Sequence, residues 1–244
     1  MRPARSPLRK RPPPSKDAPP PAELSVLDSI RLVLCLVAMT IVRLGTFRIF
    51  RGGARVTASD LLTIPDWKGK TFTTINKQIL REYRTRNAGD SKTIAECWGC
   101  DRYYIQAGVK SDTPVEASPL LAMLMARHWI LRITVFVLQT FFTIQTVSLW
   151  VNGHGPATTE THFDSDHNLV IVLHGACTFH TAPRSAFAPG GPGCRENEST
   201  NSPRNSDLFT ARPMIAGMMA IQPGHMWHYV ESSPHSVKLA IFFR

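Results

Sequence analysis

Short apolar segments separated by glycine and proline turns constrain the fold of this chain more than any other feature. Residues 169–174 (LVIVLH) form a continuous apolar run followed by glycine, as expected of a strand buried on both faces. Met218–Gln222 and Val237–Phe243 are two further strand-like runs, and Pro223-Gly224 is a turn signal after the first of them. Many short strands joined by such turns predict a mainly β fold, a sandwich or a barrel such as the jelly roll.

Only a few helices are expected beside these strands. Residues 119–127 (PLLAMLMAR) are rich in Leu, Met and Ala and predict a helix, and residues 76–83 (NKQILREY) predict a shorter one. Residues 130–151 contain many β-branched and aromatic side chains, which favour two core strands. The strand-rich part begins at residues 103–106 (YYIQ). Residues 189–207, rich in Gly, Pro, Ser and Asn, predict a surface loop.

The formal net charge of +10 belongs almost entirely to the N-terminal part of the chain. Residues 1–56 hold 11 Lys and Arg against three acids, a net of +8, which leaves 17 basic and 15 acidic residues, a net of +2, in residues 57–244. The remainder therefore offers little charge with which to bind a phosphate backbone, and we expect no specific nucleic-acid binding.

The N-terminal part divides into two segments ahead of a predicted domain over residues 57–244. Residues 1–24 are rich in Pro, Arg and Lys and are expected to be a disordered basic leader. Residues 25–56 contain an apolar run of 11 residues, 32–42, which is shorter than the roughly 20 residues of a transmembrane helix. Three readings stay open: an organelle or secretory targeting signal, an amphipathic helix on a membrane surface, or a helix packed on the domain. An intracellular location is favoured, with membrane association or organelle targeting as alternatives.

The cysteines do not describe a disulfide framework, because their number is odd and their spacing is scattered. Cys97 and Cys100 form a lone CxxC motif, and no second pair of zinc ligands follows at a suitable spacing. Two cysteines at the edge of a core are therefore the preferred interpretation of that motif.

The strongest sign of chemistry is a pair of metal-binding side chains, His162 and Asp164. At positions i and i+2 of a strand, both side chains face the same side. A distant histidine such as His228 would complete a set of two imidazoles and one carboxylate, the facial triad of non-haem Fe(II) oxygenases. Spacing alone leaves alternatives open: Asp166 and His167 are also available near the first pair, and a histidine at 225 could replace His228.

The sequence around these residues resembles a known family. Residues 157–169 (ATTETHFDSDHNL), residues 221–232 (IQPGHMWHYVES) and the upstream residues 103–106 are similar, in order and spacing, to motifs of the JmjC/cupin-like Fe(II)/2-oxoglutarate-dependent oxygenases. This is the branch that includes the asparaginyl hydroxylase acting on hypoxia-inducible factor. The resemblance covers residues 103–244 and implies a double-stranded β-helix, the cupin-like form of the jelly roll.

The resemblance also implies roles for individual residues. His162, Asp164 and His228 match the family's catalytic Fe(II) ligands. Tyr104, Thr159 and Asn168 match positions that bind the co-substrate 2-oxoglutarate or line its pocket. One departure stands out: the family normally carries a Lys two residues after the glycine that follows the buried strand, where it neutralises the far carboxylate of 2-oxoglutarate, and this chain has Cys177 there.

Two hypotheses about function follow from these observations. The first is an Fe(II)/2-oxoglutarate-dependent oxygenase that hydroxylates a protein or peptide side chain. The second, which the cysteine in place of the usual Lys favours, is a non-catalytic or 2-oxoglutarate-independent metal-binding module. Membrane contact through residues 25–56 is compatible with either hypothesis.

Overall fold

The computed structural model describes residues 46–51, 54–57, 70–73, 104–109, 115, 118–159, 161–186 and 207–244, together with residues 30 and 33; for 70–73 and 104–109 it describes the backbone alone. The helices are α5 (Pro119–Arg127) and α6 (Trp129–Phe141), with a 3-10 turn η1 (Arg184–Ala186). The strands are β1 (Arg48–Arg51), β2 (Lys70–Thr73), β3 (Tyr104–Val109), β4 (Ile144–Asn152), β5 (Ala157–Thr158), β6 (His167–His174), β7 (Ala176–Ala182), β8 (Thr210–Ile215), β9 (Met218–Gln222), β10 (Trp227–Ser232) and β11 (Val237–Phe243).

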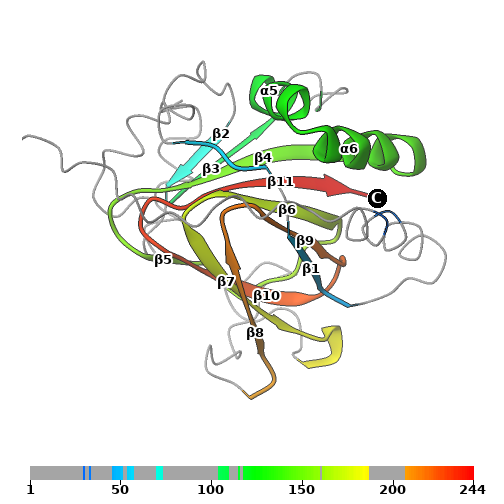
Figure 1. The fold of residues 1–244 in the computed structure, drawn as a ribbon. Coiled ribbons are helices and arrows are strands. Elements are labelled where there is room, and N and C mark those ends of the chain that lie inside the picture. Colours follow the sequence, from blue (N-terminus) through cyan, green and yellow to red (C-terminus); the bar gives the residue numbers. More distant parts are fainter. Residues whose placement is uncertain are drawn as a thin grey trace, which may run out of the picture.

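The strands form two antiparallel sheets that face each other (Figure 1). The larger sheet has the order β1-β9-β6-β11-β4-β3-β2, and the smaller sheet has the order β5-β10-β7-β8. Four strands of the larger sheet, β9-β6-β11-β4, lie opposite the four strands of the smaller one, which is the arrangement of a double-stranded β-helix. The predicted mainly β, cupin-like jelly roll is therefore confirmed.

Strand β11 shows how the larger sheet divides its side chains between two faces. Because successive residues of a strand point to opposite sides, alternate residues share one environment. The odd-numbered residues from Val237 to Phe243 are buried on the face that packs against the helices. The even-numbered residues, Lys238, Ala240 and Phe242, line a pocket between the two sheets. The interior of the jelly roll is therefore separate from the helix-covered core.

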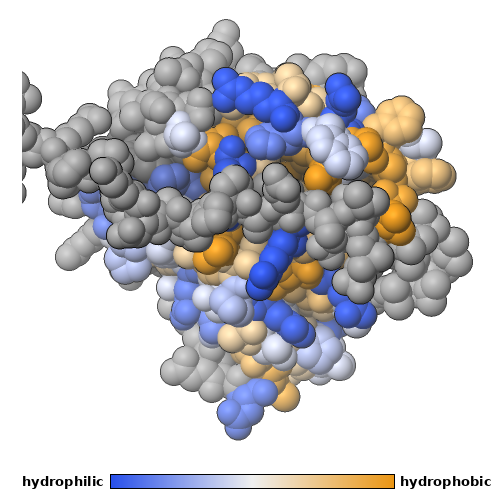
Figure 2. Space-filling model, viewed as in Figure 1, coloured by the Kyte–Doolittle hydropathy of each residue, from blue (hydrophilic) through white to orange (hydrophobic). Residues whose placement is uncertain are grey.

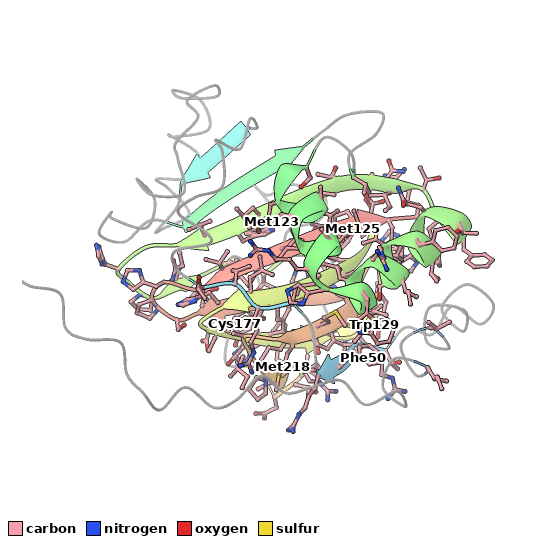
Figure 3. All side chains as sticks on the ribbon, turned by 45° about the horizontal axis from the view of Figure 1, so that its top comes forward. Phe50, Met123, Met125, Trp129, Cys177 and Met218 are labelled. Carbon is pink, nitrogen blue, oxygen red and sulfur yellow. The ribbon has the colours of Figure 1, made fainter. Side chains whose placement is uncertain are left out.

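Two hydrophobic clusters follow from this alternation. The outer cluster lies between the larger sheet and the helices, and Met123 and Met125 of α5 pack against it. The inner cluster lies between the sheets and contains Cys177, Phe179 and Met214. Figure 3 labels the two methionines on the helix and Cys177 on the other side of the larger sheet.

Helix α5 confirms the prediction for residues 119–127, and its sequence shows why it forms. The Ser118 side chain caps the helix by accepting a hydrogen bond from the Leu121 N–H at 3.2 Å. A proline occupies the first turn, where its missing N–H costs nothing. The helix ends at His128, whose backbone N–H donates to the Leu124 carbonyl.

The prediction of two core strands over residues 130–151 was wrong in its first half. Residues up to Phe141 form helix α6, and only Ile144–Asn152 forms a strand, β4. The buried residues of α6 recur at helical spacing (Leu131, Thr134, Val135, Leu138). Packing of this face on the outer cluster outweighs the strand preference of its β-branched residues. The opposite face leaves Phe136 exposed to solvent. In Figure 2, apolar side chains gather on the surface where Figure 1 draws α6.

The remaining strand predictions agree with the structure. Residues 169–174 lie in β6, and the predicted strands 218–222 and 237–243 are β9 and β11. The predicted helix 76–83, the Cys97/Cys100 motif and most of the polar segment 189–207 lie outside the described residues.

In the N-terminal part, the structure describes β1, which pairs antiparallel with β9 in the larger sheet. The leader 1–24 and nearly all of the apolar run 32–42 lie outside the described residues, and the division of the chain into segments stays a prediction. Among the helices that the structure describes, none has the length and apolar character needed to cross a membrane.

Candidate metal centre

The segment between β5 and β6 carries His162 and Asp164 and is held against β10 by backbone hydrogen bonds. His162 and His228 exchange both of their N–H to carbonyl bonds, at 3.0 and 2.8 Å, in an isolated antiparallel bridge. The Asp164 carbonyl accepts from the His225 N–H at 2.6 Å. Residues more than sixty positions apart in sequence are thereby placed side by side.

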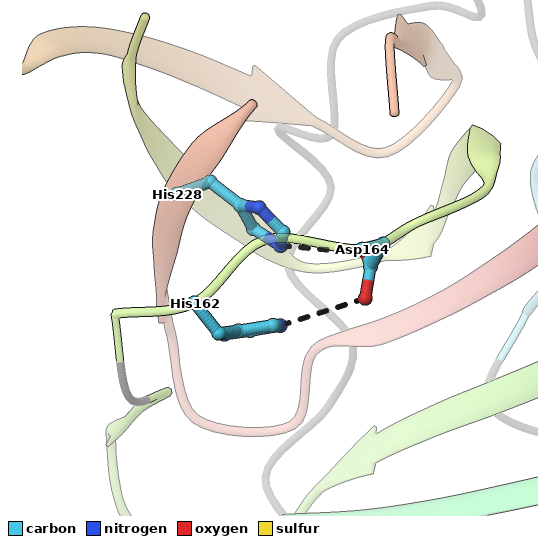
Figure 4. A group of neighbouring side chains, drawn as sticks. All are labelled: His162, Asp164 and His228. Atoms are coloured by element: carbon cyan, nitrogen blue, oxygen red, sulfur yellow. Dashed lines mark ion pairs between the residues drawn. The ribbon is translucent and has the colours of Figure 1, made fainter. Parts of the chain in front are cut away.

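The three predicted ligands converge on one point at the edge of the interior pocket (Figure 4). His162 Nε2 lies 3.9 Å from Asp164 Oδ1, and His228 Nε2 lies 3.7 Å from Asp164 Oδ2. One ligand atom from each of the three residues lies within 4.8 Å of the other two. Ligands bound at right angles about 2.1 Å from one ion lie roughly 3 Å apart. The two His–Asp distances would therefore shorten by less than about 1 Å around a metal, and the widest separation in the set by no more than about 2 Å.

The alternatives that spacing left open are engaged elsewhere. Asp166 forms an ion pair with the Arg244 guanidinium. His167 Nδ1 accepts a hydrogen bond from the Gly224 N–H at 3.0 Å. His225 has a left-handed backbone (φ 61°), and its ring packs 5.5 Å from that of Phe163. In the described part of the chain, only His162, Asp164 and His228 form a cluster suited to holding a metal.

The surroundings of His228 prepare its Nε2 atom for coordination. Its Nδ1 donates to the Met226 carbonyl at 3.1 Å, which leaves the lone pair on Nε2, the nitrogen that faces Asp164. The Gln222 amide lies 2.9 Å from the same Nδ1, and its Oε1 has no hydrogen-bond partner among the described residues. Turned with Oε1 toward Nδ1, this amide accepts the same hydrogen and further orients the ring.

Burial also controls the charge of the cluster. Burial lowers the pKa of His228 well below its ordinary value of 6.5, and the neighbouring His162 ring adds to the effect. The imidazole is therefore neutral at pH 7, the form that binds metals. Burial raises the pKa of the Asp164 carboxyl, while His162 acts in the opposite direction. A cation between these groups would stabilise the ionised carboxylate that burial disfavours.

The pocket beside the cluster contains two of the three residues predicted to contact a co-substrate, Thr159 and Asn168. Thr159 Oγ1 accepts a hydrogen bond from the Val230 N–H at 2.8 Å, which leaves the hydroxyl hydrogen able to donate. Asn168 is buried, and its Oδ1 has no partner among the described residues. The third residue, Tyr104, lies in β3, but its side chain is outside what the structure describes.

Among the pocket residues that escaped prediction from the sequence, three carry polar groups: Gln222, Trp150 and Lys238. The one available signal was a lysine inside the otherwise apolar run of β11. Cys177, which the resemblance places where the family has a Lys, is buried in the inner cluster. Burial raises the pKa of its thiol, so the side chain is uncharged at neutral pH.

Comparison of the structure finds similar solved proteins, whereas the comparisons of the sequence find no match. No protein-family model matches the sequence, and no curated protein matches it. The solved structure of E. coli ycfD is similar in fold, with a TM-score of 0.53 and 8% identity over 85% of this chain and 52% of that one. The chain thus spans about half the length of that protein.

Weaker similarities link the chain to two further solved structures. One is YcfD, described as a ribosomal oxygenase from Escherichia coli in complex with cobalt and 2-oxoglutarate (TM-score 0.47, 9% identity, 82% of this chain and 48% of that one). The other is an oxidoreductase of the 2OG-Fe(II) oxygenase family from Burkholderia pseudomallei (TM-score 0.46, 11% identity, 87% of this chain and 90% of that one). At these identities, the similarity to E. coli ycfD establishes the fold alone.

Proposed function

We propose that this chain is an Fe(II)- and 2-oxoglutarate-dependent oxygenase that hydroxylates a protein side chain. The observation that carries the proposal is the convergence of His162, Asp164 and His228 at the edge of a pocket inside a jelly roll. Two imidazoles and one carboxylate leave three coordination positions of an octahedral ion open, which is the arrangement that oxygenases require.

The donor set fits Fe(II), and the fit rests on features beyond the identity of the ligands. The His228 ring is held by the Met226 carbonyl and presents Nε2 toward the cluster. The bridge between His162 and His228 fixes the two backbones relative to each other. When bound, the iron would activate O2 with electrons from the co-substrate, while the protein orients the reactants and limits access of water.

The pocket provides groups suited to a small polar co-substrate. The hydroxyl of Thr159 and the side-chain amide of Asn168, which can both donate hydrogen bonds to a carboxylate, sit among apolar side chains such as Phe179 and Phe242. A few polar groups in a largely apolar pocket are typical of small-molecule sites. We assign these residues, with Tyr104 by resemblance, to 2-oxoglutarate.

A protein substrate is the finer part of the proposal. It is supported by the resemblance of the sequence motifs to a branch that includes an asparaginyl hydroxylase. It is also compatible with the structural similarity to E. coli ycfD, since YcfD is described as a ribosomal oxygenase.

The test is binding followed by turnover. Purified protein should bind Fe(II) and 2-oxoglutarate under anaerobic conditions and should release succinate once O2 is admitted. His162→Ala should abolish both metal binding and succinate release. His180→Ala is the matched control, because His180 pairs with Glu231 at 3.1 Å and does not line the pocket. Firm metal binding without 2-oxoglutarate binding or succinate release would refute the proposal.

That last outcome would support the second candidate, a metal-binding module that does not use 2-oxoglutarate. Cys177 is the observation that favours it, because a buried, uncharged thiol cannot neutralise a carboxylate. Membrane contact through residues 25–56 stays a prediction for either function. A comparison of full-length protein with a version starting near residue 46, by sedimentation with vesicles, would test it.

A further inference from the structure

A lysine is buried between the two sheets. Lys238 exposes only 3% of its surface and lies within β11, between apolar neighbours in sequence. Burying a charged lysine removes its hydration, which disfavours the charged form, so few lysines are fully buried in folded proteins. Among the described residues that line the pocket, it is the only ammonium group, and Asp164 is the only carboxylate.

The register of the strands places this ammonium group at a distance from the metal cluster. The Lys238 Nζ atom contacts the Ser232 hydroxyl, and Ser232 lies four residues along β10 from His228. At about 3.3 Å per residue, the two Cα atoms are separated by roughly 13 Å of strand. Lys238 and His228 nevertheless line one pocket, with Val230 between Ser232 and His228 on the same face. The cation and the metal ligands thus mark separate regions of one pocket.

The register also brings Lys238 next to the residue that replaces the family's lysine. Ser232 is the direct cross-strand partner of Cys177 on β7. Cys177 is also close enough to Lys238 for the two groups to influence each other electrostatically. A lysine at position 177 and the lysine at 238 would therefore approach the same place from opposite sheets.

We propose that Lys238 binds the far carboxylate of 2-oxoglutarate, with the positive charge supplied by β11 of the larger sheet instead of position 177 on β7. This inference rests on the proposed function and identifies a binding residue within the same site. A five-carbon dicarboxylate would chelate the metal through its 2-oxo acid end. Its other end would reach the ammonium group.

The energetics of the buried lysine agree with this role. Burial lowers the pKa of Lys238 below its ordinary value of 10.5, because the charged form loses hydration. An anion that binds beside it would compensate that loss and favour the charged form. A small, uncharged Cys177 side chain avoids the repulsion that a second ammonium group would create in the same space.

The experiment compares two oxo acids that differ only at the far end. Co(II)-loaded protein is titrated calorimetrically, without O2, with 2-oxoglutarate and with 2-oxobutyrate, which lacks the second carboxylate. The variants are Lys238→Met, Lys238→Arg and the exchange Cys177→Lys/Lys238→Met. Metal affinity is measured for each variant first, and thermal unfolding checks that each is folded.

We expect Lys238→Met to weaken 2-oxoglutarate binding about 10- to 100-fold, the effect of losing one charge-assisted bond. Its affinities for Co(II) and for 2-oxobutyrate should stay within about twofold of wild type, because neither ligand needs the ammonium group. Lys238→Arg should retain more affinity for 2-oxoglutarate than Lys238→Met. The exchange variant Cys177→Lys/Lys238→Met should regain affinity for 2-oxoglutarate, because it places the ammonium group on β7.

Unchanged 2-oxoglutarate affinity in Lys238→Met would overturn the inference, as would an equal loss for both oxo acids. If Lys238→Met fails to fold, the affinities of the wild-type protein for the two oxo acids still test the inference. Equal affinities for 2-oxoglutarate and 2-oxobutyrate would exclude recognition of the far carboxylate. Wild-type protein that binds Co(II) but neither oxo acid would show instead that the proposed function itself is wrong.

Discussion

Gly224 offers a test of how the fold positions the metal ligands without altering a ligand. It lies in the turn between β9 and β10 and packs on the loop that carries Asp164. A Cβ atom at position 224 would lie 2.7 Å from the Ser165 carbonyl oxygen, where ordinary contact begins at 3.4 Å, so the two segments would have to separate by 3.4 − 2.7 = 0.7 Å. Both sides of this contact are backbone, so neither can rotate away.

Gly224→Ala should therefore shift the loop that holds Asp164. Two hydrogen bonds join the same two segments. The Gly224 N–H donates to His167 Nδ1, and the His225 N–H donates to the Asp164 carbonyl. Overpacking of this kind costs about 1–3 kcal/mol of unfolding free energy. Displacing the supports of a metal ligand typically lowers metal affinity about 10- to 100-fold.

Gly217→Ala is the matched control at the other end of β9. Gly217 has φ +84°, a left-handed conformation in which alanine costs about 1–2 kcal/mol. The three atoms nearest to its added Cβ all belong to the Arg55 side chain and none to the backbone. The two variants should thus lose similar stability in denaturant titrations with chelator present, while only Gly224→Ala loses Co(II) affinity by calorimetry. Equal Co(II) affinities in the two variants would refute the reasoning.

Three further predictions concern the pocket and the outer core. Gln222→Leu should lower Co(II) affinity about 10- to 100-fold without removing a ligand, because the amide next to His228 Nδ1 is lost; calorimetry that shows wild-type affinity would contradict this. Lys238 has a folded-state pKa below 10.5, so the unfolded chain binds more protons at this site between the lowered value and pH 10.5. The unfolding free energy of metal-free wild type should therefore rise with pH across that window relative to Lys238→Met, with Cys177 common to both, and parallel curves in denaturant titrations at several pH values would contradict the assignment. Leu138→Ala should cost about 2–5 kcal/mol and Phe136→Ser within about 0.5 kcal/mol, since the first is fully buried on α6 and the second is exposed; similar losses would argue against the helix.

Local sequence predicted most elements of the jelly roll, because their signals are short-range. The runs that became β6 and β9 are largely apolar and end at glycine or proline turns, and β11 contains five consecutive apolar residues, 239–243. Helix α5 has its cap, its proline and its helix-forming residues within ten positions. Helix α6 was mistaken for strand because β-branched residues favour strands in isolation, and only its packing on the outer cluster reveals the helical period.

The candidate metal centre divides in the same way. The spacing of His162 and Asp164 is a local property that the sequence shows directly, and the family resemblance pointed to His228 as the third member. Spacing alone left open the choice among Asp166, His167 and the two histidines at 225 and 228. That choice depends on the backbone bridge that aligns His162 with His228.

Lys238 is the clearest case of a property that only the tertiary structure decided. Period-two alternation shows that it shares a face with Ala240 and Phe242, but it does not show what lies opposite that face. The antiparallel register between β7 and β10, set by pairing across more than fifty residues, brings Ser232 and Cys177 to the same place. The sequence by itself determined that Cys177 stands where the resembled family has a lysine. The fold decided that Lys238 lies beside Cys177, because sheet pairing joins residues that no local pattern relates.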